Sequence, residues 1–294
     1  MKFSLPQSGR EILTLSLEGS TLRVLQARGR RITAWLSLPF NPAFLSGGFI
    51  ADPTGMAEVI RNALIRKGLH ARRVRAAFPG FQSLSRLITL PRAKELHPEE
   101  ILPGEARRLM RISLEDTYLF WQRVAITSRQ QRFLVLAIPK APLQTFVETL
   151  RLAGLRPSRL ELKPLSLVKA VGQPQAIIAS VETNGIDIVI VIDHLPMLMR
   201  SLYLGEGALT LETVPSPLVD ELSHTISFYN NSNPDKQLPS GTPLYLCGAL
   251  ASGLDASAIG QEFGMPAGEL HPVLNVPPEF PLAQMLVNLG LAIG

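Results

Sequence analysis

The chain has 294 residues, of which 46% are hydrophobic and 18% charged. This length suits two domains of ordinary size, and the apolar share is typical of a folded globular protein. The single cysteine, Cys247, excludes a disulfide framework and a cysteine-based zinc site. No stretch supplies the roughly 20 consecutive apolar residues of a membrane-spanning helix, and the N-terminus lacks the apolar core of a secretion signal. We therefore expect a soluble, cytoplasmic protein.

Charge is unevenly distributed along the chain. Residues 1–150 carry 22 Lys and Arg against 11 Asp and Glu, a net charge of +11, whereas residues 151–294 carry 7 against 13, a net charge of −6. This asymmetry favours an anionic partner for the first half, such as a membrane surface, a nucleic acid or an acidic protein. A basic face that is merely solvated is the alternative. Nucleic acid is less favoured, because residues 61–75 lack interleaved aromatic side chains for base stacking.

The first half of the sequence predicts alternating strands and helices. Apolar patterning predicts strands at 11–17 and 22–27, joined in a hairpin by the turn at 18–21. Asp52-Pro53 is typical of a helix start, with an aspartate cap before a first-turn proline. The helix expected at about 99–110 should be broken or delayed by Pro103. The further elements predicted here are strands at 74–78, 86–90, 117–127 and 131–138 and a helix at 142–153.

The second half repeats the opening of the first. Strands are predicted at 175–181 and 186–192, again joined by a short turn. The remaining elements are expected to be strands at 195–204 and 244–247 and helices at 217–230 and 255–263. This alternation predicts an α/β protein with mixed sheets. Because the hairpin-first opening occurs twice, the sequence indicates two similar domains related by duplication.

Four blocks of sequence occur in the order in which one known family has them. They are AAFPGFQSLSRLITLP (76–91), EARRLMRISLEDTYLFWQ (105–122), TLRLAGLRPSRLELKPLSLVKAV (149–171) and DELSHTISFYNN (220–231). Together they resemble the PilM family of type IV pilus assembly proteins, which belongs to the actin-like ATPase superfamily and is related to the cell-division protein FtsA. The resemblance implies an α/β, actin-like (duplicated RNase H-like) two-domain fold with a small inserted subdomain and a trimmed second-domain insertion.

The resemblance also implies a division of the chain. Residues 1–83 would form the first part of domain 1, and residues 84–155 an inserted subdomain that returns to domain 1. Residues 156–294 would form domain 2, with a C-terminal helix that returns to domain 1. The second-domain insertion is expected to be trimmed, because only nine residues separate Thr210 from Asp220.

In this family two hairpin loops and a glycine-rich turn hold a nucleotide, and this chain departs from the pattern at each. Ser16 and Ser180 stand where the two aspartates near the metal belong. Glu18 and Glu182 replace the two glycines that let backbone N–H groups wrap the phosphates. A carboxylate in a phosphate cradle repels the ligand, and losing both aspartates weakens a magnesium site. The third motif keeps Gly248 but little other glycine.

We therefore expect no ATPase activity, no catalytic residue, no metal site and no required cofactor, with Mg-ATP binding as the alternative. The residues that would hold a vestigial nucleotide, as the resemblance implies, are Ser16, Gly19, Ser20, Thr21, Arg23, Ser180, Thr183, Asn184 and Gly248. The five histidines lack metal-ligand spacing, and no hydrolase elbow or P-loop occurs. Cys247 lies in an apolar strand and is expected to be a buried, structural thiol.

The function implied by the resemblance is that of a scaffold at the cytoplasmic face of a bacterial inner membrane. It would bind the N-terminal cytoplasmic tail of a PilN-like inner-membrane protein, and other pilus assembly proteins are further candidates. The groove between the inserted subdomain and domain 1 would hold this tail, an apolar segment of Asn-Leu-Leu-Pro type. Candidate partner-binding residues are Arg107, Arg108, Arg111 and Trp121; ordinary packing with snorkelling arginines is the alternative.

Three other functions remain open at this point. An actin-like ATPase whose nucleotide state gates the partner would need its altered loops to bind Mg-ATP. The cytoplasmic domain of a type II secretion protein of the same fold normally continues into a membrane span, and this chain is expected to lack one. A sugar-kinase-like enzyme is disfavoured, because no aspartate occupies a matching loop.

Overall fold

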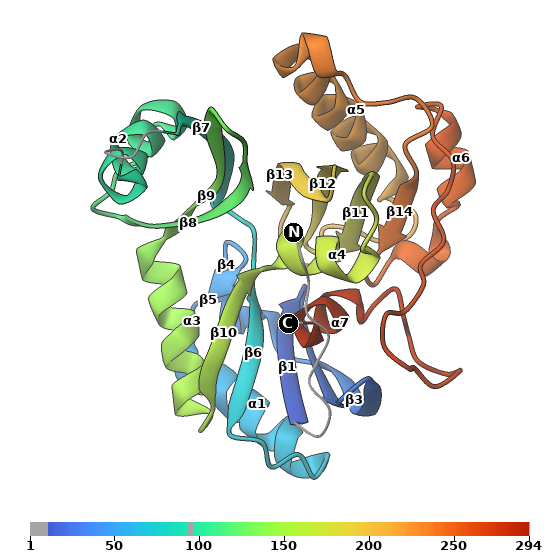
Figure 1. Ribbon diagram of the computed structural model, residues 1–294. Coiled ribbons are helices and arrows are strands. Elements are labelled where there is room, and N and C mark those ends of the chain that lie inside the picture. Colours follow the sequence, from blue (N-terminus) through green and yellow to red (C-terminus); the bar gives the residue numbers. More distant parts are fainter. Residues whose placement is uncertain (1–10, 93–96, 294) are drawn as a thin grey trace.

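The structure is a computed structural model that describes residues 11–92 and 97–293. Of the two α/β domains, the second lies above and to the right of the first, and a smaller body formed by residues 84–92 and 97–139 lies above the first domain at the upper left (Figure 1). The α/β class and the mixed sheets predicted from the sequence are confirmed. None of the helices formed by the described residues is both long and apolar enough to cross a lipid bilayer.

The first domain is built on a five-stranded sheet with the order β10-β6-β1-β2-β3. Its strands are β1 (Glu11–Glu18), β2 (Thr21–Arg28), β3 (Arg31–Pro39), β6 (Arg73–Phe78) and β10 (Arg156–Leu162). β1, β2 and β3 are antiparallel, whereas β6 runs parallel to both β1 and β10. The hairpin predicted at 11–27 is confirmed.

Helices α1 (Pro53–Arg66) and α3 (Lys140–Leu152) pack into the core of the first domain. The Asp52 side chain accepts a hydrogen bond from the backbone N–H of Gly55 at 2.9 Å, and Pro53 takes the first helical position, so the predicted cap of α1 is confirmed. Before α1, a short 3-10 helix (Pro42–Phe44) leads into a small hairpin formed by β4 (Leu45–Ser46) and β5 (Phe49–Ile50).

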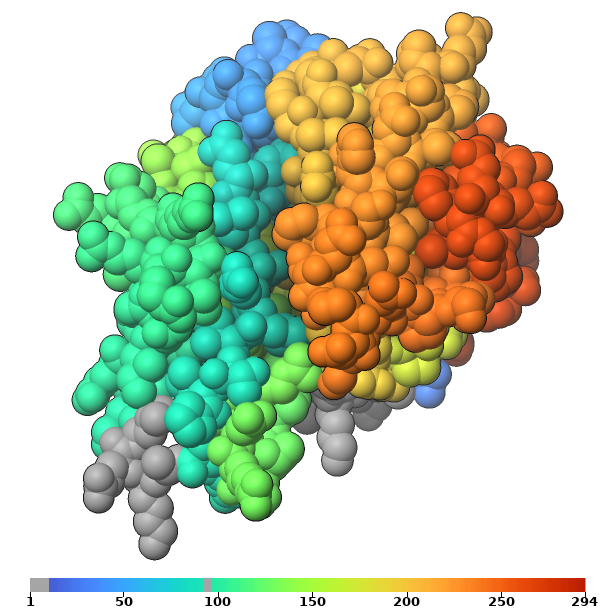
Figure 2. Space-filling view, turned by 90° about the horizontal axis from the view of Figure 1, so that it is seen from above, coloured from blue at the N-terminus to red at the C-terminus, as the bar shows by residue number. Residues whose placement is uncertain are grey.

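The inserted subdomain is a three-stranded antiparallel sheet covered on one face by a helix. Its elements are β7 (Leu84–Pro91), α2 (Pro98–Met110), β8 (Thr117–Ile126) and β9 (Gln130–Pro139), in the sheet order β7-β9-β8. Seen from above, this subdomain (teal and green) lies beside the second domain (gold to red), as Figure 2 shows. Leu84 from the subdomain and Ser201 from the second domain line the same small cavity along this seam.

The second domain is built on a four-stranded sheet with the order β13-β12-β11-β14. Its elements are α4 (Lys163–Val171), β11 (Ala176–Glu182), β12 (Gly185–Ile192), β13 (Leu195–Tyr203), α5 (Pro215–Ser232), a 3-10 helix (Pro234–Lys236), β14 (Leu244–Cys247), a second 3-10 helix (Ala251–Gly253), α6 (Ala256–Gln261) and α7 (Leu286–Ala292). Every residue of β11 is buried, as its run of small and β-branched side chains predicts for a central strand.

The two sheets repeat one topology, which confirms the predicted duplication. In each sheet three hairpin-connected antiparallel strands are followed by a fourth that lies parallel to the first, as β6 does to β1 and β14 to β11. Beside β14 a single parallel bridge, Leu244 to Ala267, occupies the place that β10 has beside β6. Between Tyr203 and Pro215 the chain forms turns rather than a further subdomain, as the trimmed insertion requires.

Helices α4 and α7 lie between the two sheets (Figure 1), and side chains from both domains form one core around them. The helices approach so closely that a side chain at Gly290 would collide with the backbone carbonyl of Ser166. The C-terminal helix therefore joins the domains, and glycine at position 290 is what allows this contact.

Three elements, β3, β10 and α4, were not predicted from the sequence. β3 and β10 are edge strands whose side chains are mostly half-buried or exposed, so they lack the apolar pattern of a central strand. α4 has only nine residues, and its polar side chains Lys163, Ser166 and Lys169 are buried together with its apolar ones. The segment is therefore short for a prediction that rests on helical periodicity.

Two predicted boundaries differ in the structure. The first-domain sheet extends beyond the expected limit at residue 156, because β10 (156–162) pairs with β6 and the crossover to the second domain follows Leu162. Helix α2 continues through Pro103, contrary to the prediction that this proline breaks or delays it. Pro103 lies inside α2, where it removes one backbone donor, while the packing of Leu102 and Ala106 holds the helix on its sheet.

Candidate functional site

The loops of the two β-hairpins, β1–β2 and β11–β12, meet in the cleft between the domains. Gly19 has a φ of +56°, and a Cβ atom built there would lie 2.5 Å from Thr183 Oγ1 of the opposite loop. Glycine is therefore needed at position 19 both for the turn and for the close contact. The hairpin register points Ser16, Glu18 and Arg23 of the first domain to one face, because Ser16 pairs with Arg23 across the hairpin.

Arg23 and Glu182 form a buried, bidentate ion pair across this cleft. The two terminal nitrogens of Arg23 donate to Glu182 Oε1 and Oε2, each at 2.8 Å, and both side chains are at most 3% exposed. Glu182 Oε1 also accepts from the backbone N–H of Ala249 at 3.2 Å. Arg23 was expected to contact phosphate, but its guanidinium is paired with a glutamate of the second domain.

Lys163 holds two further carboxylates, one from each domain. Its Nζ lies 2.6 Å from Glu18 Oε2 and 2.8 Å from Asp187 Oδ2. Asp187 in turn accepts a hydrogen bond from the Ser201 hydroxyl. The five charged side chains Glu18, Arg23, Lys163, Glu182 and Asp187, here called the cleft ion network, therefore connect the first sheet to the second. Lys163 and Asp187 were not predicted from the sequence. A cation partner such as Lys163 could have been expected, because the buried carboxylates of Glu18 and Glu182 each require one.

Burial and pairing shift the pKa values within the cleft ion network. Burial raises the pKa of Glu18 above its usual range, although Lys163 partly opposes this. Burial alone would lower the pKa of Lys163, but Asp187 and Glu18 outweigh it and raise that pKa. The pKa of Arg23 is raised because Glu182 outweighs the cost of burial. Both cations therefore stay charged at any physiological pH.

A fourth carboxylate, that of Glu206, contacts both hairpin loops from the segment after β13. Glu206 Oε2 accepts from the Ser20 hydroxyl at 3.3 Å, and Glu206 Oε1 accepts from Asn184 Nδ2 at 3.4 Å and from the Tyr203 hydroxyl at 3.2 Å. Ser20 and Asn184, both predicted nucleotide contacts, are brought together, and the protein's own carboxylate lies between them. Glu206 lies just before residues 211–219, where the trimmed segment was expected.

The remaining predicted nucleotide residues also gather around the hairpins. Ser16 is buried and donates to Asn288 Oδ1 of α7 at 3.0 Å. Ser180 is buried, and Thr21 begins β2 opposite Glu18. Gly248 has a φ of +100°, and a side chain there would collide with the carbonyl of Val181. Cys247 is buried, as predicted, and burial raises the pKa of its thiol to about 12.

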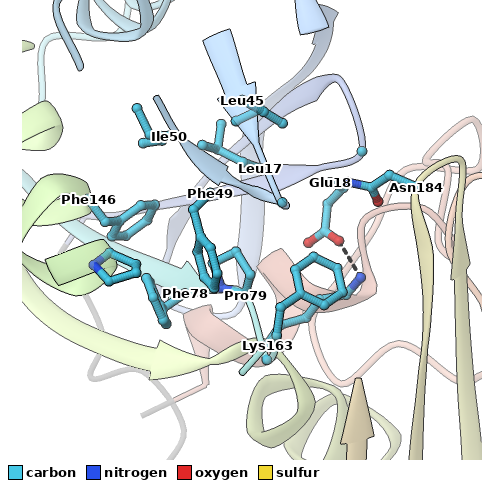
Figure 3. A pocket seen from close by; sticks show the side chains of 15 residues that line it. Leu17, Glu18, Leu45, Phe49, Ile50, Phe78, Pro79, Phe146, Lys163 and Asn184 are labelled. Atoms are coloured by element: carbon cyan, nitrogen blue, oxygen red, sulfur yellow. Dashed lines mark ion pairs between the residues drawn. The ribbon is translucent and has the colours of Figure 1, made fainter. Parts of the chain in front are cut away.

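The cavity beside Glu18 and Lys163 is small. Figure 3 shows Phe49, Phe78 and Phe146 on its apolar side and the Glu18–Lys163 ion pair on its polar side. Its volume is about 20 Å³, which is room for about one water molecule. Within the described residues, His, Cys, Asp and Glu side chains form no group of three that could ligate a metal ion.

A much larger groove lies between the inserted subdomain and the first domain, with a cavity volume of about 670 Å³. Its walls come from β8, β9 and α3 on one side and from β10 and α4 on the other. The apolar lining residues include Phe120, Leu136, Ile138, Leu143, Val147, Leu160 and Leu165. β8 and β10 are both edge strands of their sheets, so unpaired backbone groups lie along this groove.

The four predicted partner-binding residues do not line this groove. Phe120 and Trp121 are neighbours on β8 and therefore point to opposite faces of the three-stranded sheet; Phe120 faces the groove. The opposite face is the one that α2 covers, and α2 carries Arg107 and Arg108, with Arg111 directly after it. The alternation of side chains along the strand predicted at 117–127 could have shown that Phe120 and Trp121 lie on opposite faces of the sheet.

Charged groups lie at the deep end of the groove, around Glu161. Lys169 Nζ donates to Glu161 Oε1 at 2.9 Å and to the carbonyl of Ile293 at 2.9 Å. Arg159 pairs with the same glutamate at 2.7 Å. Burial lowers the pKa of Lys169 to about 8, although Glu161 partly opposes this.

We predict that Lys163→Met destabilises the protein by about 3–5 kcal/mol, because Glu18 and Asp187 would stay buried without a cation. Urea unfolding followed by the fluorescence of Trp35, whose ring packs on Phe280 at the domain interface, measures the loss. The matched control is Lys163→Met/Glu18→Gln/Asp187→Asn, which removes the stranded charges and should recover part of the stability. If the triple variant is less stable than Lys163→Met, the charge argument is wrong.

We also predict a pH dependence for Lys169. Its pKa is lower in the folded chain, about 8, than the ordinary 10.5, so between these values the unfolded state binds more protons. The stability of the wild type relative to Lys169→Met should therefore rise by about 3 kcal/mol from pH 8 to 10.5. Urea unfolding of both proteins across this range measures the difference, and a flat or falling difference contradicts the prediction.

Neither a protein-family model nor a curated protein matches this chain by sequence. Solved structures do match. A PilM–PilN type IV pilus biogenesis complex has a chain that is 20% identical, with a TM-score of 0.78 over 96% of this chain and 97% of that chain.

Two further solved structures share the architecture. The cytoplasmic domain of EpsL, an inner membrane component of the type II secretion system of Vibrio cholerae, is 12% identical, with a TM-score of 0.55 over 96% of this chain and 94% of that one. A Bacteroides thetaiotaomicron protein with an actin-like ATPase fold is 13% identical, with a TM-score of 0.52 over 97% and 96%. The chain therefore has the actin-like two-domain fold, in a form similar to that of PilM.

Proposed function

We propose that this chain is a cytoplasmic adaptor of a type IV pilus or related secretion machine. It holds the short N-terminal tail of a PilN-like inner-membrane protein in the groove between the inserted subdomain and the first domain. It thereby lies at the inner face of the cell membrane through that partner, and its action is scaffolding rather than catalysis.

The observation that carries this proposal is the groove itself. It is an elongated apolar space of about 670 Å³, and edge strands β8 and β10 lie along it. An extended peptide is recognised by such a surface through backbone hydrogen bonds to a strand edge and apolar side chains in pockets. A tail of Asn-Leu-Leu-Pro type supplies both.

The comparisons support the same proposal. The PilM chain that shares this fold over 96% of the present chain was solved in a complex with PilN. The EpsL cytoplasmic domain belongs to an inner-membrane component of a secretion system. Each alignment spans 96% of this chain, so the inserted subdomain that forms one wall of the groove lies largely within the aligned region.

We propose further that the hairpin site neither binds nor hydrolyses ATP. The cleft ion network places the carboxylates of Glu18 and Glu182 where phosphates would need backbone donors, and Arg23 and Lys163 are already paired with carboxylates. Glu206 lies between the two loops as a further negative charge. A polyphosphate would have to displace these buried pairs, which costs several kcal/mol.

The groove is tested with a fluorescent peptide that contains Asn-Leu-Leu-Pro, titrated with the full chain and followed by fluorescence anisotropy. We predict that Phe120→Ser weakens binding at least about tenfold, because an aromatic anchor is lost from the groove wall. The matched control is Trp121→Ser on the next residue of the same strand, which should bind within about twofold of wild type. The triple variant Arg107→Ala/Arg108→Ala/Arg111→Ala should behave like the control.

The opposite pattern decides against the groove. If Trp121→Ser or the arginine variant loses binding while Phe120→Ser does not, the tail binds on the α2 face. A peptide that binds none of these proteins, wild type included, contradicts the adaptor proposal.

For the hairpin site we predict no heat of binding when Mg-ATP is titrated into the purified protein at high-micromolar concentration. A nucleotide-binding actin relative measured alongside is the positive control. Binding with a micromolar dissociation constant would show that the serine and glutamate loops still hold phosphate, and a nucleotide-gated adaptor would replace the scaffold.

A further inference from the structure

Exposed cations gather at one end of the first-domain sheet, and the topology explains why. β1, β6 and β10 are parallel and all begin at this end, whereas antiparallel β2 ends there and turns into β3. Helix α1 leads into β6 and helix α3 into β10, so the C-terminal ends of both helices lie at the same end. In Figure 1 this is the lower end of the first domain.

Ten basic side chains belong to this surface, here called the basic end. They are Arg28, Arg30, Arg31, Arg61, Arg66, Lys67, Arg72, Arg73, Arg151 and Arg156, and all ten are exposed. None of them forms an ion pair with an acidic side chain in the part of the chain that the structure describes. Glu11 lies at the same end, opposite Arg28 in the β1–β2 ladder, so the surface keeps a large net positive charge.

Two aliphatic side chains project from the basic end. Ile65, in the last turn of α1, is 63% exposed, and Leu152, the last residue of α3, is 43% exposed. The two helix ends are adjacent, because the Arg61 guanidinium donates to the Leu152 carbonyl at 2.6 Å. Arg66 and Arg151 flank these two side chains in sequence, so the apolar pair is bordered by cations.

The combination of exposed cations with two exposed aliphatic side chains distinguishes between anionic partners. Guanidinium and ammonium groups bind phosphate oxygens of either a lipid or a nucleic acid. Binding to single-stranded nucleic acid uses aromatic side chains for stacking, and this surface offers aliphatic ones instead. Exposed aliphatic side chains surrounded by cations suit the interface of an anionic bilayer, where they enter the acyl region while the cations contact headgroups.

We propose that the basic end docks directly on an anionic phospholipid bilayer, with Ile65 and Leu152 entering the interface. This contact is separate from the groove and needs no partner protein. Arg151 lies at the basic end and also lines the groove. A tail that is bound in the groove therefore emerges from it close to the docked surface. The membrane itself then orients the first domain, in addition to the tail.

The test is co-sedimentation of the full chain, without any peptide, with vesicles of phosphatidylcholine alone or mixed with phosphatidylglycerol. Binding is expected only to the anionic vesicles and should weaken steeply as salt is raised. Arg66→Glu/Lys67→Glu/Arg72→Glu should reduce it at least about tenfold. The matched control is Arg107→Glu/Arg108→Glu/Arg111→Glu, which makes the same charge change on the inserted subdomain and should bind like the wild type. Thermal melts confirm that the variants are folded.

Ile65→Ser/Leu152→Ser tests the apolar contact, and about a tenfold loss of binding to anionic vesicles is expected at unchanged charge. Equal binding to neutral and anionic vesicles, or equal loss in the two charge-reversal variants, overturns the proposal. The proposal is also overturned if duplex DNA displaces the protein from the vesicles and the serine variant binds the vesicles as well as the wild type does. The basic end would then be a nucleic-acid site. Because no peptide is present, a failure here is distinct from a failure of the groove.

Discussion

The domain arrangement of this protein depends on buried ion pairs that cross the interdomain cleft. Arg23 and Lys163 hold Glu18, Glu182 and Asp187 between the two sheets, and all five side chains are nearly inaccessible. Buried charges of this kind are tolerated when each is paired with an opposite charge, as these are, so the positions of both hairpins are fixed together. The cations that an actin-like protein could offer to a phosphate are here neutralised by the chain itself.

The rest of the interface is consistent with this constraint. Helices α4 and α7 pack between the sheets at backbone contact, and Gly290 permits the approach. Asn288 of α7 forms hydrogen bonds both with Ser16, a predicted nucleotide contact, and with the backbone carbonyl of Arg23. The same helix that joins the domains therefore also closes the back of the cleft, which favours one fixed arrangement of the domains over a nucleotide-driven change.

The two surfaces proposed to bind partners lie on the outside of the first domain. The groove along β8 and β10 offers apolar side chains and unpaired strand edges, and the basic end offers cations around two aliphatic side chains. Both surfaces belong to the domain that carries the inserted subdomain and most of the positive charge. A rigid body with two neighbouring contact surfaces suits a scaffold placed against a membrane.

The sequence by itself determined the α/β class, the duplicated hairpins and the cap of α1, because these depend on local pattern. That Glu18 and Glu182 stand at the positions of phosphate-loop glycines is what the family resemblance implies. Tertiary structure alone decided what the glutamates contact, since Lys163 and Asp187 are distant in sequence from Glu18. It also decided which face of β8 meets the groove, so that Phe120 and not Trp121 lines it. β10 and α4 were not predicted because the edge strand β10 lacks the burial pattern of a central strand, and the nine residues of α4 are few for a prediction that rests on helical periodicity.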